Sequence, residues 1–203
     1  MPIPLKPANS GDARGLSTGM SGSPRNTEAS ALAYEVIVAA SVLDAWRQDI
    51  FVKLLGGAES VGTAAYLAIN TRAPKVAAIT AAAKSVLPDF AFSRFKKLVD
   101  ASEKIEKYRD KLAHWQRYEV ERVGGELCLR DPMAPRDPNK APALGIFVFS
   151  KQEMRDHIAY AVELADAQFI FLRVFESGPP WEESDFASLD LKLEYLATLR
   201  GTI

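Results

Sequence analysis

The sequence predicts a mainly α-helical protein, an antiparallel helical bundle with a small inserted β-hairpin. Two observations lead to this prediction. Apolar residues recur at alternating intervals of three and four along most of the chain, which is the period of an amphipathic helix. The spacing changes to the two-residue alternation of strands in only one segment, 118–149. Several helices with one apolar face each bury those faces by packing side by side.

Composition limits the classes of protein that fit. The 203 residues are 48% hydrophobic and 25% charged, which is ordinary usage for a globular protein. A net charge of -1 excludes a globally basic nucleic-acid binder and leaves only a local basic patch. Cys128 is the only cysteine, so no intrachain disulfide forms and a reducing cytoplasm fits best. No apolar run reaches transmembrane length without charges, so no membrane partner is expected.

Caps and helix breakers place the predicted helices. Residues 1–26 are rich in proline and glycine and poor in large apolar side chains, which predicts a flexible leader. Gly56 ends the first helix, and Pro74 separates the second from the third. Ser150 and Glu153 form a capping box that opens the fifth. The predicted helices span 27–55, 58–70, 75–87, 89–115 and 150–177, with a C-terminal amphipathic helix in 178–203.

The segment between the fourth and fifth helices is predicted to hold a hairpin and a loop. Residues 118–123 and 126–130 alternate in polarity on either side of Gly124-Gly125, which is a two-residue turn signal. Four prolines within 131–145 favour an extended loop. Residues 145–149 are a candidate third strand.

The chemistry-bearing segment is Tyr108-Arg109-Asp110-Lys111-Leu112-Ala113-His114, at the end of the fourth helix. It combines a permanent cation, a carboxylate and an imidazole, which are the groups needed to act on a phosphodiester without a metal. Lys107 and Lys111 make it locally basic. Judged from the residues alone, salt bridges within the bundle and packing at the helix end are the favoured roles, and a basic run is more often a solvated helix face.

This segment resembles the signature of HEPN domains, in which arginine is followed by Asn, Asp or His and, after a few residues, by histidine. Arg109, Asp110 and His114 fall on the three positions of the motif. The resemblance extends over Thr27 to Ser177, because a long helix that ends in the motif is followed by a variable hairpin and a closing helix. It implies a HEPN-like bundle at 27–177 with an insertion at 118–149.

The resemblance implies a homodimeric, metal-independent endoribonuclease of the kind found among bacterial toxins and antiphage effectors. RNA and a cognate antitoxin would be its partners, and no cofactor is implied. Attack by the 2'-hydroxyl needs one group to remove a proton and another to protonate the leaving 5'-oxygen, so two subunits would supply two histidines. Arg109 would clamp the phosphate, and Asp110 would orient its neighbours. The substrate-binding residues would be Lys107, Tyr108 and Lys111. The alternative is a catalytically inactive HEPN-like module that binds RNA or a protein.

Helix geometry sets one condition on this site. Five residues of ideal helix leave Arg109 and His114 about 140° apart around the axis. The helix must therefore end or distort near Ala113, or the two side chains must serve different parts of a shared cleft. His157, the other histidine, is interpreted as a partly exposed helix residue, with a role as second site histidine as the lesser alternative.

Overall fold

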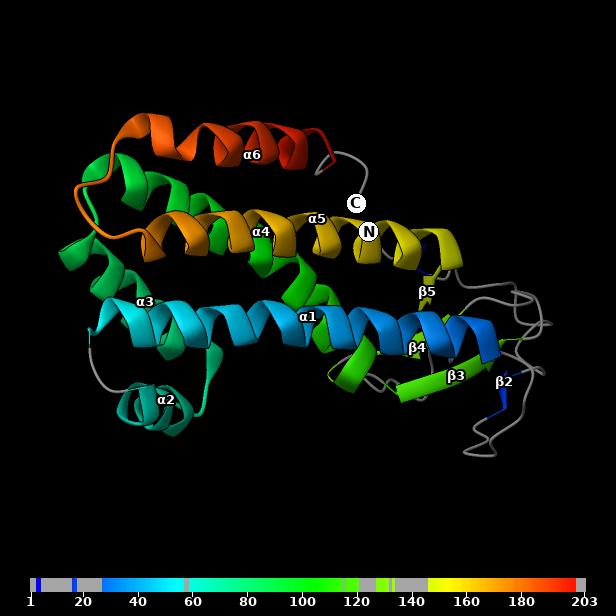
Figure 1. Ribbon diagram of the computed structural model, residues 1–203. Helices are drawn as coiled ribbons and strands as arrows, with labels where there is room; N and C mark the ends of the chain where they lie inside the picture. The colour runs from blue at the N-terminus through cyan, green and yellow to red at the C-terminus, as the bar shows by residue number, and fades with distance from the viewer. Residues whose placement is uncertain are drawn as a thin grey trace. The chain divides into compact units, whose positions relative to one another are not determined.

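The computed structural model describes residues 3–4, 16–17, 27–56, 59–114, 116–120, 127–131, 133 and 146–199. The prediction of a mainly helical protein with a small antiparallel sheet is confirmed for this part of the chain (Figure 1). The α-helices are α1 (Thr27–Leu54), α2 (Glu59–Ala68), α3 (Arg72–Val86), α4 (Asp89–His114), α5 (Lys151–Glu176) and α6 (Ala187–Leu199). A 3-10 turn, Glu183–Phe186, leads into α6.

The sheet has five strands in the order β1-β5-β4-β3-β2, and each neighbouring pair is antiparallel. The strands are β1 (Ile3–Pro4), β2 (Leu16–Ser17), β3 (Gln116–Val120), β4 (Leu127–Arg130) and β5 (Ile146–Phe149). The third strand predicted after the hairpin is confirmed as β5. The two edge strands lie within residues 1–26, the segment predicted as a flexible leader, and the leader itself stays a prediction. Edge pairing uses main-chain groups, so it needs no large apolar side chains.

The hairpin register differs from the predicted one. Tyr118 of β3 lies opposite Cys128 of β4, whereas a two-residue turn at Gly124-Gly125 would place it opposite Asp131. The turn itself lies outside the described residues. Leu127 and Leu129 are buried in the core, so the packing of β4 fixes the register more strongly than the glycine pair does.

The chain forms two compact units, each assembled from separate segments. The sheet unit draws on residues 1–38 and 106–158, and the helix unit draws on 39–105 and 159–202. Helices α1, α4 and α5 therefore each contribute to both units. The predicted division at residues 26 and 177 follows chain order, and it stays a prediction.

The core of the sheet unit gathers apolar side chains from three helices and two strands. Its buried residues are Ala29, Leu32, Ala33 and Val36 of α1, Tyr108 and Leu112 of α4, Leu127 and Leu129 of β4, Phe149 of β5, and Met154 of α5. Full burial of one such leucine or phenylalanine contributes about 1.5–3 kcal/mol. The predicted cap of α5 is present, since the Glu153 amide donates to Ser150 Oγ at 3.0 Å. Glu28 adds ion pairs to Lys151 and Arg155 at 2.6 and 2.5 Å.

The helix unit is stabilised by packing among Trp46, Phe95 and Phe171 and by a series of buried hydrogen bonds. Trp46 Nε1 donates to the Gln168 carbonyl at 2.8 Å, and Gln168 Nε2 donates to Ser102 Oγ at 3.1 Å. Lys53 of α1 pairs with Glu176 of α5 at 2.7 Å. Residue numbers on α1 and α5 therefore rise together, and these helices run parallel within this unit.

The predicted antiparallel arrangement holds for α4 against α5, where Phe95 contacts Phe171 and Ser102 contacts Gln168. It is wrong for α1 against α5. The chain between α1 and α5 is long, and only a short connection forces neighbouring helices to run antiparallel.

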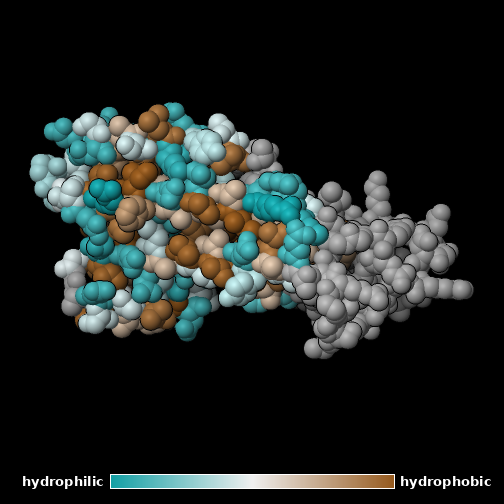
Figure 2. Space-filling model, turned by 45° about the vertical axis from the view of Figure 1, so that its right-hand side comes forward, coloured by the Kyte–Doolittle hydropathy of each residue, from teal (hydrophilic) through white to brown (hydrophobic). Residues whose placement is uncertain are grey.

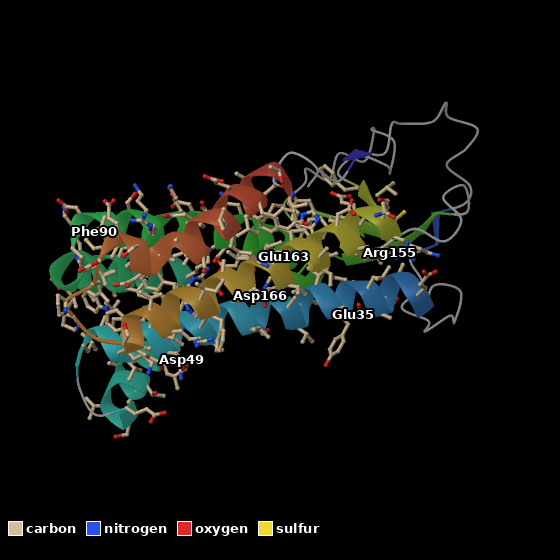
Figure 3. The ribbon with its side chains drawn as sticks, turned by 45° about the horizontal axis from the view of Figure 1, so that its top comes forward. Glu35, Asp49, Phe90, Arg155, Glu163 and Asp166 are labelled. Atoms are coloured by element: carbon tan, nitrogen blue, oxygen red, sulfur yellow. The ribbon has the colours of Figure 1, made fainter. Side chains whose placement is uncertain are left out.

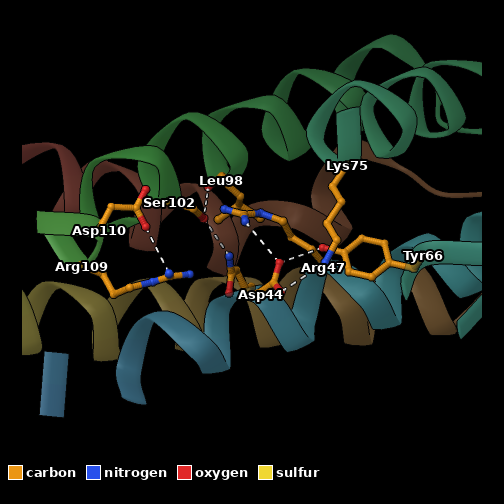
Figure 4. Close-up of polar contacts among 9 residues, drawn as sticks. Asp44, Arg47, Tyr66, Lys75, Leu98, Ser102, Arg109 and Asp110 are labelled. Atoms are coloured by element: carbon orange, nitrogen blue, oxygen red, sulfur yellow. Dashed lines mark hydrogen bonds and ion pairs between the residues drawn. The ribbon is translucent and has the colours of Figure 1, made fainter. Parts of the chain in front are cut away.

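A polar cluster around Asp44 joins the first three helices (Figure 4). Tyr66 of α2 donates to Asp44 Oδ1 at 2.8 Å, while Arg47 and Lys75 lie 3.7 and 3.8 Å from its carboxylate. Helix α3 begins at Arg72, so Pro74 lies inside its first turn rather than before it. Proline is tolerated there because the first amides of a helix have no intrahelical acceptor.

Helix α1 is long and apolar enough to cross a membrane, judged by length and composition alone. The expectation drawn from the sequence was stricter, because it required an apolar run of transmembrane length without charges. Only 39% of its most apolar window is buried inside the structure. Part of an apolar helix therefore stays uncovered.

Candidate functional site

The predicted motif lies at the C-terminal end of α4, in the sheet unit. The helix continues through His114, and Trp115 lies outside the described residues. Tyr108 and Leu112 are buried because positions four apart share one helix face, and that face packs into the core. His114 is exposed at the helix end.

Tyr108 does not fit the predicted role of substrate-binding residue, because its side chain is only 4% exposed. Its ring stacks on His157 with centroids 3.6 Å apart and lies 5.5 Å from Phe149. No hydrogen-bond partner of its hydroxyl is found among the described residues. Burial, with smaller effects from the Glu153 and Asp156 carboxylates, raises the pKa of Tyr108 far above its ordinary value. This tyrosine is a neutral core residue that holds α4 in place.

Arg109 and Asp110 form an ion pair in which the guanidinium Nη1 lies 3.1 Å from the carboxylate Oδ1 (Figure 4). The arginine side chain is 33% exposed. Its Nε is buried, with no hydrogen-bond partner in the described part of the chain. Partly exposed pairs contribute about 0.2–1 kcal/mol, so a phosphate group that binds Arg109 can displace Asp110.

A single chain does not bring Arg109 and His114 together. Because α4 remains helical through His114, the two side chains keep the separation of about 140° expected for an ideal helix. Helix α4 ends at His114, close to the predicted end near Ala113, but it is helical up to that residue and so leaves the two side chains apart. Lys107 is exposed and Lys111 is partly exposed on the same helix. The motif thus offers cations in several directions around the end of α4.

His157 is buried at 3% exposure, so its interpretation as a partly exposed residue is wrong. Its Nδ1 lies 2.8 Å from the Glu153 carbonyl, which only accepts, so this nitrogen carries the hydrogen and donates. The burial of His157 was predictable from the sequence. His157 follows the buried Met154 by three residues and precedes the buried Ala161 by four, which is the spacing of a core-facing helix stripe.

No group of three or more His, Cys, Asp or Glu side chains that suits a metal ion occurs within the described ranges. Cys128 is a free, buried cysteine on β4. Comparison with known protein families, curated proteins and solved structures finds no match to the chain.

Proposed function

We propose that this protein is a metal-independent endoribonuclease of HEPN type that acts as a cytoplasmic homodimer. The observation that supports it most directly is the exposure of His114 at the end of α4, just over one turn beyond the ion pair of Arg109 and Asp110. A titratable group in contact with solvent is able to reach a polymer substrate, whereas a buried histidine such as His157 is not. A role as a toxin or antiphage effector, held in check by a cognate antitoxin, would suit such an activity.

The proposed mechanism needs two chains. One His114 removes the proton from the RNA 2'-hydroxyl, whose oxygen then attacks the adjacent phosphorus. The His114 of the second chain protonates the leaving 5'-oxygen, and the products are a 2',3'-cyclic phosphate and a free 5'-hydroxyl. Arg109 exchanges Asp110 for a phosphate oxygen and offsets the charge that grows on it. The separation of Arg109 from His114 around α4 is compatible with this scheme because each chain has to present the two groups in different directions.

The second candidate function is a catalytically inactive HEPN-like module that binds RNA or a protein. The pair of Arg109 with Asp110 favours it, because an arginine already neutralised by a carboxylate is less available to a scissile phosphate. Lys107 and Lys111 would still attract a polyanion without any chemistry.

The two functions separate in one cleavage assay. Mixed RNA is incubated with the protein in excess chelator, alongside the variants Arg109→Ala, His114→Gln and Arg155→Ala. Arg155 is the matched control, because it is an exposed arginine of the same unit that pairs with Glu28. If the protein is a ribonuclease, the wild type and Arg155→Ala should both cleave RNA. The cleavage rate should fall about 100-fold or more in each of the two motif variants. Binding without cleavage supports the inactive module, and an undiminished rate in His114→Gln excludes the proposed mechanism.

A further inference from the structure

The helix unit contains a cavity of about 470 Å³ that the proposed ribonuclease does not use. Its walls are the C-terminal part of α1, the first half of α2 and the C-terminal end of α5. Every residue that lines it belongs to the helix unit. Sites for small molecules usually have volumes of about 300–1,000 Å³. The cavity is therefore large enough to hold a small organic ligand.

Close packing of α2 on α1 holds two of the walls in place. Gly62 of α2 lies so near Val52 of α1 that an added Cβ atom would come within 3.0 Å of the valine side chain. The rings of Phe51 and Tyr66, with centroids 5.7 Å apart, join the same two helices. These contacts exist without a ligand, so the cavity is preformed, as most ligand sites are.

The charged side chains that line the cavity are mainly carboxylates. Asp49 of α1, Glu59 of α2 and Glu176 of α5 are among them, and Lys53 is the one basic residue among the described lining residues. Figure 3 shows Asp49 on α1, beside the C-terminal end of α5. Lys53 Nζ lies 2.7 Å from Glu176 Oε1, and this pair neutralises one carboxylate.

The other two carboxylates lack a counter-charge in the described part of the chain. No ion pair or side-chain hydrogen bond of Asp49 or Glu59 occurs there. Both residues are exposed, so water reaches them in the absence of a ligand. With Lys53 and Glu176 paired, the lining keeps a formal charge of -2. A hollow of one sign concentrates ions of the opposite sign, so the cavity attracts cations.

Apolar side chains lie next to the carboxylates in the same cavity. Val52 of α1 and Leu172 of α5 both line it. Asp49 precedes Val52 by one helical turn, and Leu172 precedes Glu176 by one turn, so each apolar residue neighbours a carboxylate on its own helix. Hydrophobic and hydrophilic residues are also interspersed on the open surface that Figure 2 shows. In the cavity, however, both kinds face one hollow, where a single ligand can contact them together.

The arrangement of the carboxylates favours an extended organic cation over a metal ion. No group of three or more His, Cys, Asp or Glu side chains within the described ranges is placed to hold a metal. Asp49, Glu59 and Glu176 therefore surround the cavity without converging on one point. A linear polyamine matches this pattern, because its ammonium groups are separated by methylene groups and each ammonium donates up to three hydrogen bonds.

We propose that this cavity binds a linear aliphatic polyamine. Its ammonium groups donate charge-assisted hydrogen bonds to Asp49 and Glu59, and its methylene carbons lie on Val52 and Leu172. The inference goes beyond the proposed ribonuclease and does not rest on it, because none of these residues belongs to the motif at the end of α4. His114→Gln should therefore bind the polyamine as the wild type does. Binding by a chain that cleaves no RNA would support this site while the proposed function failed.

Calorimetric titration of the full chain with spermidine tests the site. The wild type should show one saturable site, and Asp49→Asn and Glu59→Gln should each raise the dissociation constant about tenfold, the effect of losing one charge-assisted hydrogen bond. Glu194→Gln is the matched control, because Glu194 is exposed on α6 outside the cavity and its substitution changes the net charge equally. It should leave the constant unchanged. An equal loss in all three variants would mean that net charge alone attracts spermidine, and this result, like a wild type that does not bind, overturns the proposal.

A ligand series tests the extended shape of the cation. Butylamine has the carbon chain of putrescine but only one ammonium group, so it should bind at least about tenfold more weakly than putrescine. Mg²⁺ at equal ionic strength should displace spermidine less readily than putrescine does, because the carboxylates do not converge on a single ion. Circular dichroism checks that every variant folds. Equal affinity for butylamine and putrescine, or displacement by Mg²⁺ as readily as by putrescine, contradicts a polyamine site.

Discussion

Replacement of Tyr108 by phenylalanine should stabilise the protein. The hydroxyl is buried without a partner among the described residues, while the ring makes its contacts with His157 and Phe149 through carbon atoms. An unsatisfied buried hydroxyl costs about 1–3 kcal/mol. Tyr108→Phe removes that cost and keeps the ring, so the free energy of unfolding should rise by about 1 kcal/mol or more.

The stability advantage of Tyr108→Phe over the wild type should grow in alkaline solution. The pKa of Tyr108 is raised in the folded state, so only the unfolded chain ionises this phenol near its ordinary pKa of about 10. The stability contributed by the neutral phenol is complete below that pH and is lost as the pH rises above it. At pH 11, about one unit above that ordinary pKa, the free energy of unfolding of the wild type should lie about a further 1.4 kcal/mol below that of Tyr108→Phe.

Urea unfolding at pH 7 and pH 11 measures both effects, and Tyr66→Phe is the control. Tyr66 is equally buried, but its hydroxyl donates to Asp44 at 2.8 Å, so this variant should lose about 1.5–3 kcal/mol. Destabilisation of Tyr108→Phe by a similar amount would refute the reasoning, because the hydroxyl would then have a partner. Loss of RNA cleavage in a folded Tyr108→Phe would restore the substrate-binding role that its burial argues against.

Three further substitutions test local features of the fold. Ser150→Ala removes the cap of α5 and should lower the free energy of unfolding by about 1 kcal/mol in urea, and an unchanged value would contradict the cap. Glu28→Gln should lower stability at pH 7 because Lys151 lowers the pKa of Glu28. The pH series should show that the difference from wild type shrinks as the pH falls through that lowered pKa, whereas a constant difference would exclude the ion pair as its cause. Gly62→Ala would place a methyl group 3.0 Å from Val52 and should cost about 1–3 kcal/mol, with partial recovery in a double variant that also carries Val52→Ala.

Helix boundaries were the most predictable part of the fold, because single residues set them. Gly56 has a φ of +60°, the left-handed conformation that favours glycine at a helix end. Ser150 caps α5 with its hydroxyl, as its spacing from Glu153 indicates. These signals act within one turn, so the sequence contains them in full.

Non-local pairing was less predictable. The strands that pair with β1 and β2 lie more than 100 residues away in the sequence. A segment rich in proline contains no pattern that indicates which strand it will pair with. The direction of α1 relative to α5 depends on where the intervening chain returns, which periodicity does not encode. The register of β3 on β4 follows from which side of β4 is buried, and the glycine pair alone suggested a different one.

The candidate site was predictable in its residue types but not in the surroundings of each residue. The spacing of Arg109, Asp110 and His114 is visible in the sequence, and so is the uninterrupted helix that keeps Arg109 and His114 apart. The burial of Tyr108 follows from its position on the face of Leu112, and helical periodicity was sufficient to find it. The pairing of Arg109 with Asp110 depends on side-chain rotamers, which the spacing does not determine.

The most direct test of the central claim, that two copies of His114 act on one phosphate, is a subunit-mixing experiment. Wild-type protein is equilibrated with a tenfold excess of His114→Gln, and RNA cleavage is measured per wild-type chain in excess chelator. Random pairing leaves each wild-type chain with a variant partner in most dimers, so a shared site predicts a fall of about tenfold. An unchanged rate per wild-type chain, or no cleavage by the wild type alone, would contradict the claim.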